Sequence, residues 1–157
     1  QNTLFVFALP EAGIGARGPV RAMREAPGAP AVDDPALSGP RTAFTRTAAA
    51  GVYSRGQATQ GSAVYERACA ACHGADYQGA GGVPPVAGAA FTGKWRGKSV
   101  GELFAYVRDT MPPGAGRSLP DAEYLAVTAY LLQANRFPAG DQPLDPDQAI
   151  LRAIGIE

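Results

Sequence analysis

Five consecutive residues, Cys69-Ala70-Ala71-Cys72-His73, constrain this chain more than any other stretch of it. They include both cysteines and the only histidine of the 157 residues. The spacing C-x-x-C-H is the attachment signature of a c-type haem. On one turn of helix, each of the two thiols can add across a haem vinyl group. The imidazole of the next residue then comes under the ring, where it can bind the iron as the proximal ligand.

Other uses of two cysteines fit the chain less well. A structural zinc site needs four ligands, typically from two such pairs, and the chain has no third cysteine and no second histidine. A thioredoxin-type C-x-x-C belongs in a βαβ unit, which the flanking sequence does not offer. A plain disulfide, or two reduced cysteines in a core, stay open as alternatives. The sequence therefore predicts one covalent haem c, attached through Cys69 and Cys72 and bound by His73.

The second axial ligand of such an iron has few candidates, because there is no other histidine and only two methionines. Met111 precedes two prolines on an expected turn between two helices, which can hold a thioether at a fixed point. Met23 lies in a segment that reads as linker, and we expect it to be incidental. A thioether ligand favours Fe(II) and raises the reduction potential. The alternative for Met111 is a core methionine that fills a gap.

Charge and composition narrow the class of protein. Fourteen basic and fourteen acidic residues cancel, which argues against a general nucleic-acid binder. No run of about eighteen apolar residues occurs, so we expect no membrane span. The N-terminus has neither the basic nor the apolar region of a signal peptide and starts with Gln1. We therefore expect the chain to be processed or cut from a longer protein.

The chain divides into four stretches that differ in amino-acid composition. Residues 1–9 are rich in β-formers and predict a short orphan strand. Residues 10–57 are dominated by Ala, Gly and Pro, cannot offset their ordering entropy by burial, and read as a linker. Residues 58–135 have the composition of a compact domain. Residues 136–157 form a tail that is rich in Pro and Asp.

Hydrophobic periodicity and capping signals predict the helices of the domain and tail. A capping box between Ser99 and Glu102 marks one start, and Pro120 suits the first turn of another. Asp145 is the expected cap of the helix in the tail. The four helices are expected over Thr59–Cys72, from Ser99 to the Met111 turn, from about Pro120 to Asn135, and over Pro146–Ile154.

Four features of residues 58–135 together resemble class I cytochromes c. They are the spacing of Gly61, Tyr65 and Cys69, the Cys69–His73 motif, Met111-Pro112, and Val127-x-x-Tyr130. The resemblance implies an all-α fold of three to four helices around a covalent haem, preceded here by the short strand and the long linker. It also implies that the last helix crosses the first at Gly61, and that Met111 is the distal ligand.

The same resemblance implies further contacts of the haem. A proline carbonyl accepts the Nδ1–H of the histidine, and Pro85 stands at the family's offset, with Pro84 as the alternative. Trp95 or Arg96 would contact a haem propionate, although a Trp that only covers the haem edge, and ordinary turn prolines, are alternatives. The basic run from Lys94 to Lys98 could steer an acidic redox partner, or be only a solvated face.

The arrangement of Gly82-Val83-Pro84-Pro85-Val86-Ala87-Gly88, Phe91 and Trp95 more closely resembles bacterial cytochrome c domains associated with quinoprotein dehydrogenases. Thr3–Pro10 resembles the last strand of a propeller that holds pyrroloquinoline quinone (PQQ), and the linker follows it. This implies an electron carrier in a PQQ-dependent alcohol or sugar dehydrogenase, not itself catalytic. It would take electrons from the dehydrogenase domain or subunit and pass them to a downstream cytochrome or oxidase in the periplasm. A free periplasmic monohaem shuttle, a five-coordinate peroxidase-like or ligand-binding haem, and a haem-free cysteine pair are the alternatives.

Overall fold

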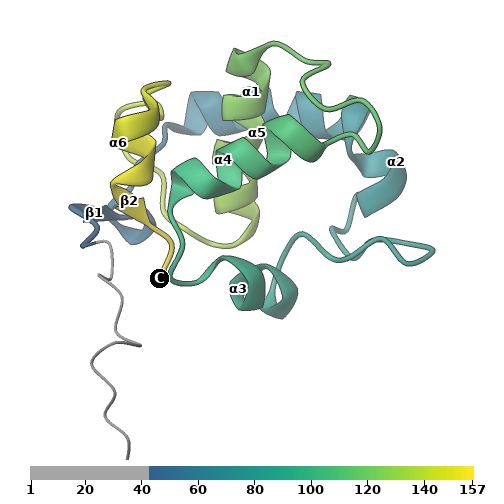
Figure 1. Ribbon diagram of the computed structural model, residues 1–157, viewed down its shortest axis with the longest axis horizontal. Helices are drawn as coiled ribbons and strands as arrows, with labels where there is room; N and C mark the ends of the chain where they lie inside the picture. The colour runs from purple at the N-terminus through teal and green to yellow at the C-terminus, as the bar shows by residue number, and fades with distance from the viewer. Residues whose placement is uncertain (1–42) are drawn as a thin grey trace, which may run out of the picture. The chain divides into compact units, whose positions relative to one another are not determined.

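The computed structural model describes residues 43–157, which are mostly helical and belong to one compact unit (Figure 1). The predicted strand over 1–9, Met23 and most of the predicted linker lie outside the described residues. No described helix has the length and apolar character needed to cross a bilayer. The elements are β1 (Arg46–Thr47), η1 (Ala48–Ala50), α1 (Arg55–Ala68), α2 (Ala70–His73), α3 (Ala89–Trp95), α4 (Val100–Thr110), α5 (Asp121–Ala134), α6 (Gln148–Arg152) and β2 (Ile154–Gly155).

Helix α1 begins four residues before the predicted start, because Ser54 caps it. The Ser54 hydroxyl accepts a hydrogen bond from the backbone N–H of Gln57 at 3.2 Å. A serine at this position satisfies one of the N–H groups that a helix leaves unpaired at its start. The first turn of α1 has no apolar residues at helical spacing. The prediction from hydrophobic periodicity therefore put the start of the helix later.

Helices α1 and α5 cross at Gly61, as the resemblance implied. A Cβ atom at Gly61 would overlap the backbone carbonyl of Ala126 and lie 2.8 Å from the Cβ of Tyr130. Val127, on the same helix, is 2% exposed. Glycine is therefore required here for the backbones to approach, and this crossing anchors the residues that follow α1.

Helix α4 starts at the predicted capping box. Ser99 accepts the backbone N–H of Glu102 at 3.1 Å, and the Glu102 carboxylate accepts the backbone N–H of Ser99 at 2.8 Å. The predicted apolar stripe is buried, and consists of Val100, Leu103, Phe104 and Val107. Helix α4 ends at Thr110, the residue before Met111. Met111 is followed by Pro112 and Pro113, which cannot continue a helix.

Helix α3 was not predicted from the sequence, which showed only a glycine-rich loop followed by a basic run. A helix of seven residues is too short to be stable by itself. Phe91 and Trp95, four residues apart, are 3% and 7% exposed, and their burial supplies the stability that helix propensity does not. Burial depends on partners far along the chain, so the segment carries no local signal.

The domain extends on both sides of the predicted range 58–135. Strands β1 and β2 pair in parallel, which joins residues 46–47 to 154–155. The Tyr53 hydroxyl, 1% exposed as a residue, donates to the carbonyl of Phe137 at 2.5 Å. Part of the predicted linker and most of the predicted tail therefore pack on the helices.

The helix of the tail is shorter than predicted, and its cap differs. Helix α6 covers Gln148–Arg152, and the Asp147 carboxylate accepts the N–H groups of Ala149 and Ile150 at 2.7 and 3.4 Å. Asp145 instead accepts the N–H of Asp147 at 2.8 Å. Asp145 therefore forms the turn that leads into the cap, and the prediction of Asp145 as the cap was wrong.

Candidate functional site

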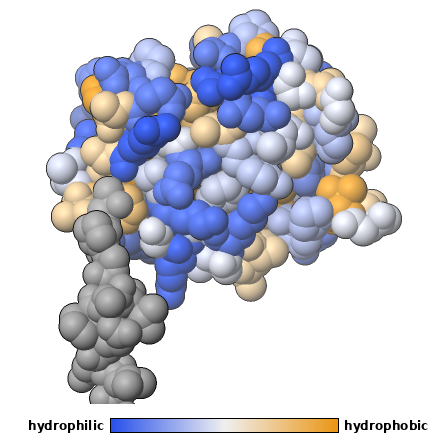
Figure 2. Space-filling view, in the orientation of Figure 1, coloured by the Kyte–Doolittle hydropathy of each residue, from blue (hydrophilic) through white to orange (hydrophobic). Residues whose placement is uncertain are grey.

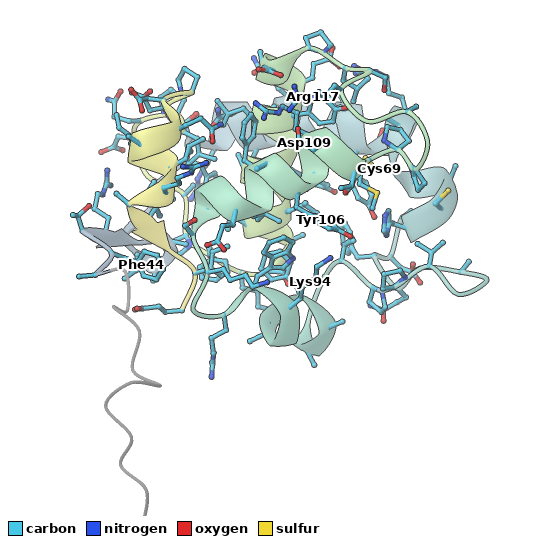
Figure 3. The ribbon with its side chains drawn as sticks, in the orientation of Figure 1. Phe44, Cys69, Lys94, Tyr106, Asp109 and Arg117 are labelled. Carbon is cyan, nitrogen blue, oxygen red and sulfur yellow. The ribbon has the colours of Figure 1, made fainter. Side chains whose placement is uncertain are left out.

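The two cysteines lie where α1 breaks and α2 begins. The prediction of one helix through Cys72 was wrong, because Cys69 leaves helical geometry at φ −123° and ψ −37°. The N–H of Cys69 still bonds to Tyr65, and the carbonyl of Cys69 accepts the N–H groups of Cys72 and His73 at 3.1 and 2.9 Å. This tight turn places both cysteines and the histidine on one short element, which Figure 3 shows at Cys69.

Both thiols are free. Cys69 is half-buried against the core and Cys72 is exposed. Burial raises the pKa of the Cys69 thiol, and the nearby Arg67 partly opposes this rise. Two free thiols on one turn, one facing the core and one facing solvent, can flank a planar group that enters from the surface.

The histidine ring is oriented by a proline carbonyl. Nδ1 of His73 lies 3.1 Å from the carbonyl oxygen of Pro84. A carbonyl only accepts, so Nδ1 carries the proton and Nε2 keeps its lone pair for a metal. The residue is Pro84, which the sequence left as the alternative, and not Pro85. A bond from the N–H of Val86 to the carbonyl of Tyr77, 2.9 Å long, fixes this part of the loop.

Three tyrosines hold the segment after His73 to the helix crossing. The Tyr65 hydroxyl donates to the carbonyl of Gly74 at 2.8 Å, and the hydroxyls of Tyr77 and Tyr130 are 2.6 Å apart. The three ring centroids lie 5.4 to 6.1 Å from one another. The bond to Tyr130, together with burial, raises the pKa of Tyr77 to about 12. Sequence reasoning missed Tyr77, because its positive φ of 66° is set by the loop and leaves no pattern.

Met111 directly follows α4, and its backbone is fixed at both ends. Its N–H donates to the carbonyl of Val107 at 3.0 Å, and its own carbonyl accepts the hydroxyl of Tyr124 at 2.9 Å. The side chain is half-buried and packs against the core that also receives Cys69 and Val86. The turn therefore holds the backbone of Met111 at a defined position. Tyr124, seen in the sequence only as an apolar residue of α5, supplies part of that hold.

Trp95 joins an aromatic cluster between α3 and α4. Its ring is 5.4 Å from that of Tyr106 in an edge-on arrangement and 6.5 Å from that of Phe91. The ammonium of Lys94 is 3.5 Å from the Tyr106 ring centroid, and Figure 3 shows these two side chains together. The nearby ammonium of Lys94 lowers the pKa of Tyr106. Lys94 and Tyr106 were not among the predicted site residues.

Arg96 lies apart from this cluster. It is exposed and lines an open pocket of about 1100 Å³ together with Phe44, Thr47, Arg152 and Glu157. Thr47 belongs to β1 and Arg152 to α6, while Phe44 precedes β1 and Glu157 is the last residue of the sequence. The contact of Arg96 with a haem propionate stays a prediction.

The donor set fits a haem c and does not fit a zinc site. Residues 43–157 contain no group of three or more His, Cys, Asp and Glu side chains that could hold a metal ion. They offer instead two thiols, an imidazole with Nε2 unoccupied by protein, and a thioether set in half-buried apolar surroundings. Thioether attachment and His/Met ligation are the chemistry of cytochromes c.

Two sequence comparisons with known proteins point the same way. A family model described as cytochrome c oxidase, cbb3-type, subunit III matches residues 56–131, just under half of the chain. The thiosulfate dehydrogenase of Stutzerimonas stutzeri (strain A1501) is 36% identical over 93 residues, which cover 55% of this chain and 28% of that protein.

A solved structure, the sulfane dehydrogenase SoxCD from Paracoccus pantotrophus, is similar at 24% identity with a TM-score of 0.44. That match covers 62% of this chain and 52% of the SoxCD chain. The chain thus spans less than a third of its curated relative and about half of the solved one. Residues 56–131, which the family model matches, contain Cys69, Cys72, His73 and Met111.

Proposed function

We propose that the domain carries electrons on one haem c, bound through thioethers at Cys69 and Cys72 with His73 and Met111 as axial ligands. The observation that carries the proposal is the 3.1 Å contact between His73 Nδ1 and the Pro84 carbonyl, on the same turn as two free thiols. When bound, the haem supplies an iron that cycles between Fe(III) and Fe(II). No substrate bond is made or broken by the chain itself.

The protein's part is to hold the ligands in place. The Pro84 carbonyl fixes the tautomer and ring orientation of His73. The hydrogen bond from Tyr65 to Gly74 fixes the peptide that follows the imidazole. A preset ligand geometry lowers the rearrangement that accompanies each change of iron charge.

Met111, as the sixth ligand of the haem iron, would determine the redox behaviour of the domain. A neutral, soft thioether stabilises Fe(II) relative to Fe(III) and raises the potential. It also fills the position at which peroxide or a small ligand would react. The hydrogen bonds of the Met111 backbone to Val107 and to the Tyr124 hydroxyl support this ligation over the five-coordinate alternative, because they fix the backbone from which the thioether extends.

The proposal also covers the proteins that donate electrons to the domain and accept electrons from it. We infer that electrons enter from a dehydrogenase domain or subunit and leave to a downstream cytochrome or oxidase. The PQQ-dependent parent implied by residues 3–10 is one version, and a free shuttle is another. The 36% identity to a protein named thiosulfate dehydrogenase favours a third version, in which the donor oxidises a sulfur anion. We place the domain in the bacterial periplasm, since haem attachment requires reduced thiols and haem delivered outside the cytoplasm.

An absorption spectrum tests the proposal. The full chain, made with haem-attachment machinery, should carry one haem by mass and show a low-spin c-type spectrum with the weak Met–Fe(III) band. A high-spin ferric spectrum would favour the five-coordinate alternative. Absence of a Soret band under the same conditions would favour the haem-free cysteine pair. Reduction by a PQQ dehydrogenase with its alcohol, compared with reduction by a thiosulfate dehydrogenase with thiosulfate, then separates the donors.

A further inference from the structure

The loop that carries Pro84 has no core of its own. Residues 79–88 lie at the surface between α2 and α3, at the right of Figures 1 and 2, and none of these ten residues is buried. Pro84 itself is exposed. Burial of apolar surface therefore contributes little to holding the Pro84 carbonyl at 3.1 Å from Nδ1 of His73, and polar contacts must fix the loop.

The start of this loop is bound to the histidine turn. The N–H of Gly79 donates to the carbonyl of His73 at 2.8 Å. Gly79 has a φ of +71°, and a Cβ atom there would overlap the carbonyl oxygen of Val83. Glycine permits both this backbone conformation and this close approach. The bond fixes where the loop begins, but the far side of Pro84 needs a second attachment.

That second attachment is the side chain of Asn135. Its Oδ1 accepts the N–H of Gly88 at 2.9 Å, and its Nδ2 donates to the carbonyls of Val86 and Leu131 at 3.1 and 2.8 Å. The amide thus uses its acceptor and both of its donor hydrogens. Two of the three bonds reach back 47 and 49 positions along the chain, so one side chain ties the loop to the end of α5.

Asn135 is itself held in place. It is the C-cap residue of α5, its N–H donates to the carbonyl of Leu131 at 3.1 Å, and its side chain is half-buried. Helix α5 crosses α1 at Gly61, and α1 leads into the turn of Cys69. The loop and the cysteine turn are therefore positioned by the same pair of helices.

The connection from Asn135 to the Pro84 carbonyl is short and stiff. Val86, whose carbonyl Asn135 binds, is two residues after Pro84. The ring of Pro85 fixes its own φ and restricts the backbone of the residue before it. Few torsions are left to absorb a displacement of Val86, so such a displacement would move the Pro84 carbonyl relative to His73.

We propose that Asn135 is a positioning residue for the proximal ligand. By binding Val86 and Gly88, it keeps the Pro84 carbonyl within hydrogen-bond reach of Nδ1 of His73 and so holds the imidazole in one orientation. Asn135 acts through the loop and not on the imidazole itself. The proposal rests on the function proposed above, in which His73 binds the haem iron.

Hydrogen exchange at the imidazole tests this role. His73 is the only histidine of the chain, so ¹⁵N-labelled histidine gives a single imidazole in the NMR spectra of the full, reduced holo-protein. Its Nδ1–H exchanges with solvent when the hydrogen bond to Pro84 opens. Asn135→Ala should speed this exchange by about tenfold and move the Nδ1 proton resonance upfield, because the hydrogen bond weakens.

Asn135→Asp separates the two attachments of the loop. A carboxylate still accepts the N–H of Gly88, and with it supports the start of α3, but it has no hydrogen to donate to Val86. This variant should also speed the exchange by about tenfold. It decides the question if Asn135→Ala fails to fold.

Gln57→Ala is the matched control, because Gln57 is also half-buried and its amide also holds a distant backbone segment. Oε1 of Gln57 accepts the N–H of Leu144 at 2.8 Å, and Nε2 donates to the carbonyl of Leu144 at 3.4 Å. Gln57→Ala should lower the urea midpoint to a degree similar to Asn135→Ala. It should change the Nδ1–H exchange by less than about twofold, because independent sites do not couple.

Unchanged exchange in the Asn135 variants, or an equal acceleration in Gln57→Ala, overturns the positioning role. The same spectra test the proposed function separately. The ring current of a haem shifts the C–H resonances of an axial imidazole far upfield. A holo-protein whose His73 resonances lack these shifts overturns the proposed function, independently of the exchange rates.

Discussion

At the scale of single residues, the site depends on polar contacts that fix ligands rather than on the ligands alone. Pro84 orients His73, and Tyr124 holds the carbonyl of Met111. Because a thioether stabilises Fe(II), Met111→Ala should lower the midpoint potential and open the iron to imidazole or cyanide. Potentiometric titration and ligand titration measure both effects. A potential equal to that of the unaltered protein would refute Met111 as the axial ligand.

At the same scale, the hydrogen-bonded hydroxyls of Tyr77 and Tyr130 make the stability of the folded protein depend on pH. The pKa of Tyr77 is raised from 10.0 to about 12 in the folded state, so the folded protein holds the proton more tightly than the unfolded chain. Its contribution to stability is therefore complete below about pH 10 and is lost as pH rises towards 12. Urea midpoints of the unaltered protein should fall across this window more steeply than those of Tyr77→Phe. Parallel curves would contradict the prediction.

At the scale of helices, the crossing of α1 and α5 sets the position of the cysteine turn. A Cβ at Gly61 would overlap the Ala126 carbonyl, so Gly61→Ala must separate the two helices and should cost about 1–3 kcal/mol of unfolding free energy. Gly56 lies on the same helix, and a Cβ added there would meet no atom within 4 Å. Gly56→Ala should instead stabilise by about 0.5–1 kcal/mol. Urea denaturation measures both, and equal effects would show that the crossing is not tight.

The short helix α3 depends on burial rather than on propensity. Phe91→Ala removes a ring that is 3% exposed and contacts Trp95, and should cost about 3–5 kcal/mol. It should also loosen the packing of Trp95 against Tyr106. Urea denaturation gives the cost, and near-ultraviolet circular dichroism of the single tryptophan reports the loosening. An unaltered tryptophan signal would mean that Trp95 is held by α4 alone.

At the scale of the whole molecule, the sequence predicted the structural features that depend on a particular residue type at one position. Ser99 and Glu102 marked the start of α4, and Gly61 marked the helix crossing, because a cap and a close approach each need a particular residue type. The break at Cys69, the choice of Pro84 over Pro85, and α3 are set by contacts with distant residues. The packing of Tyr53 on Phe137, 84 positions away, likewise leaves no pattern in a stretch rich in Ala and Gly.

The central claim is that His73 and Met111 both bind the iron of a haem held by Cys69 and Cys72. Proton NMR of the reduced holo-protein tests it most directly, because the haem ring current shifts the methyl group of an axial methionine far upfield. We predict one such methyl resonance in the unaltered protein, and none in Met111→Ala. A reduced spectrum without it, or one in which it persists in Met111→Ala, would contradict the account.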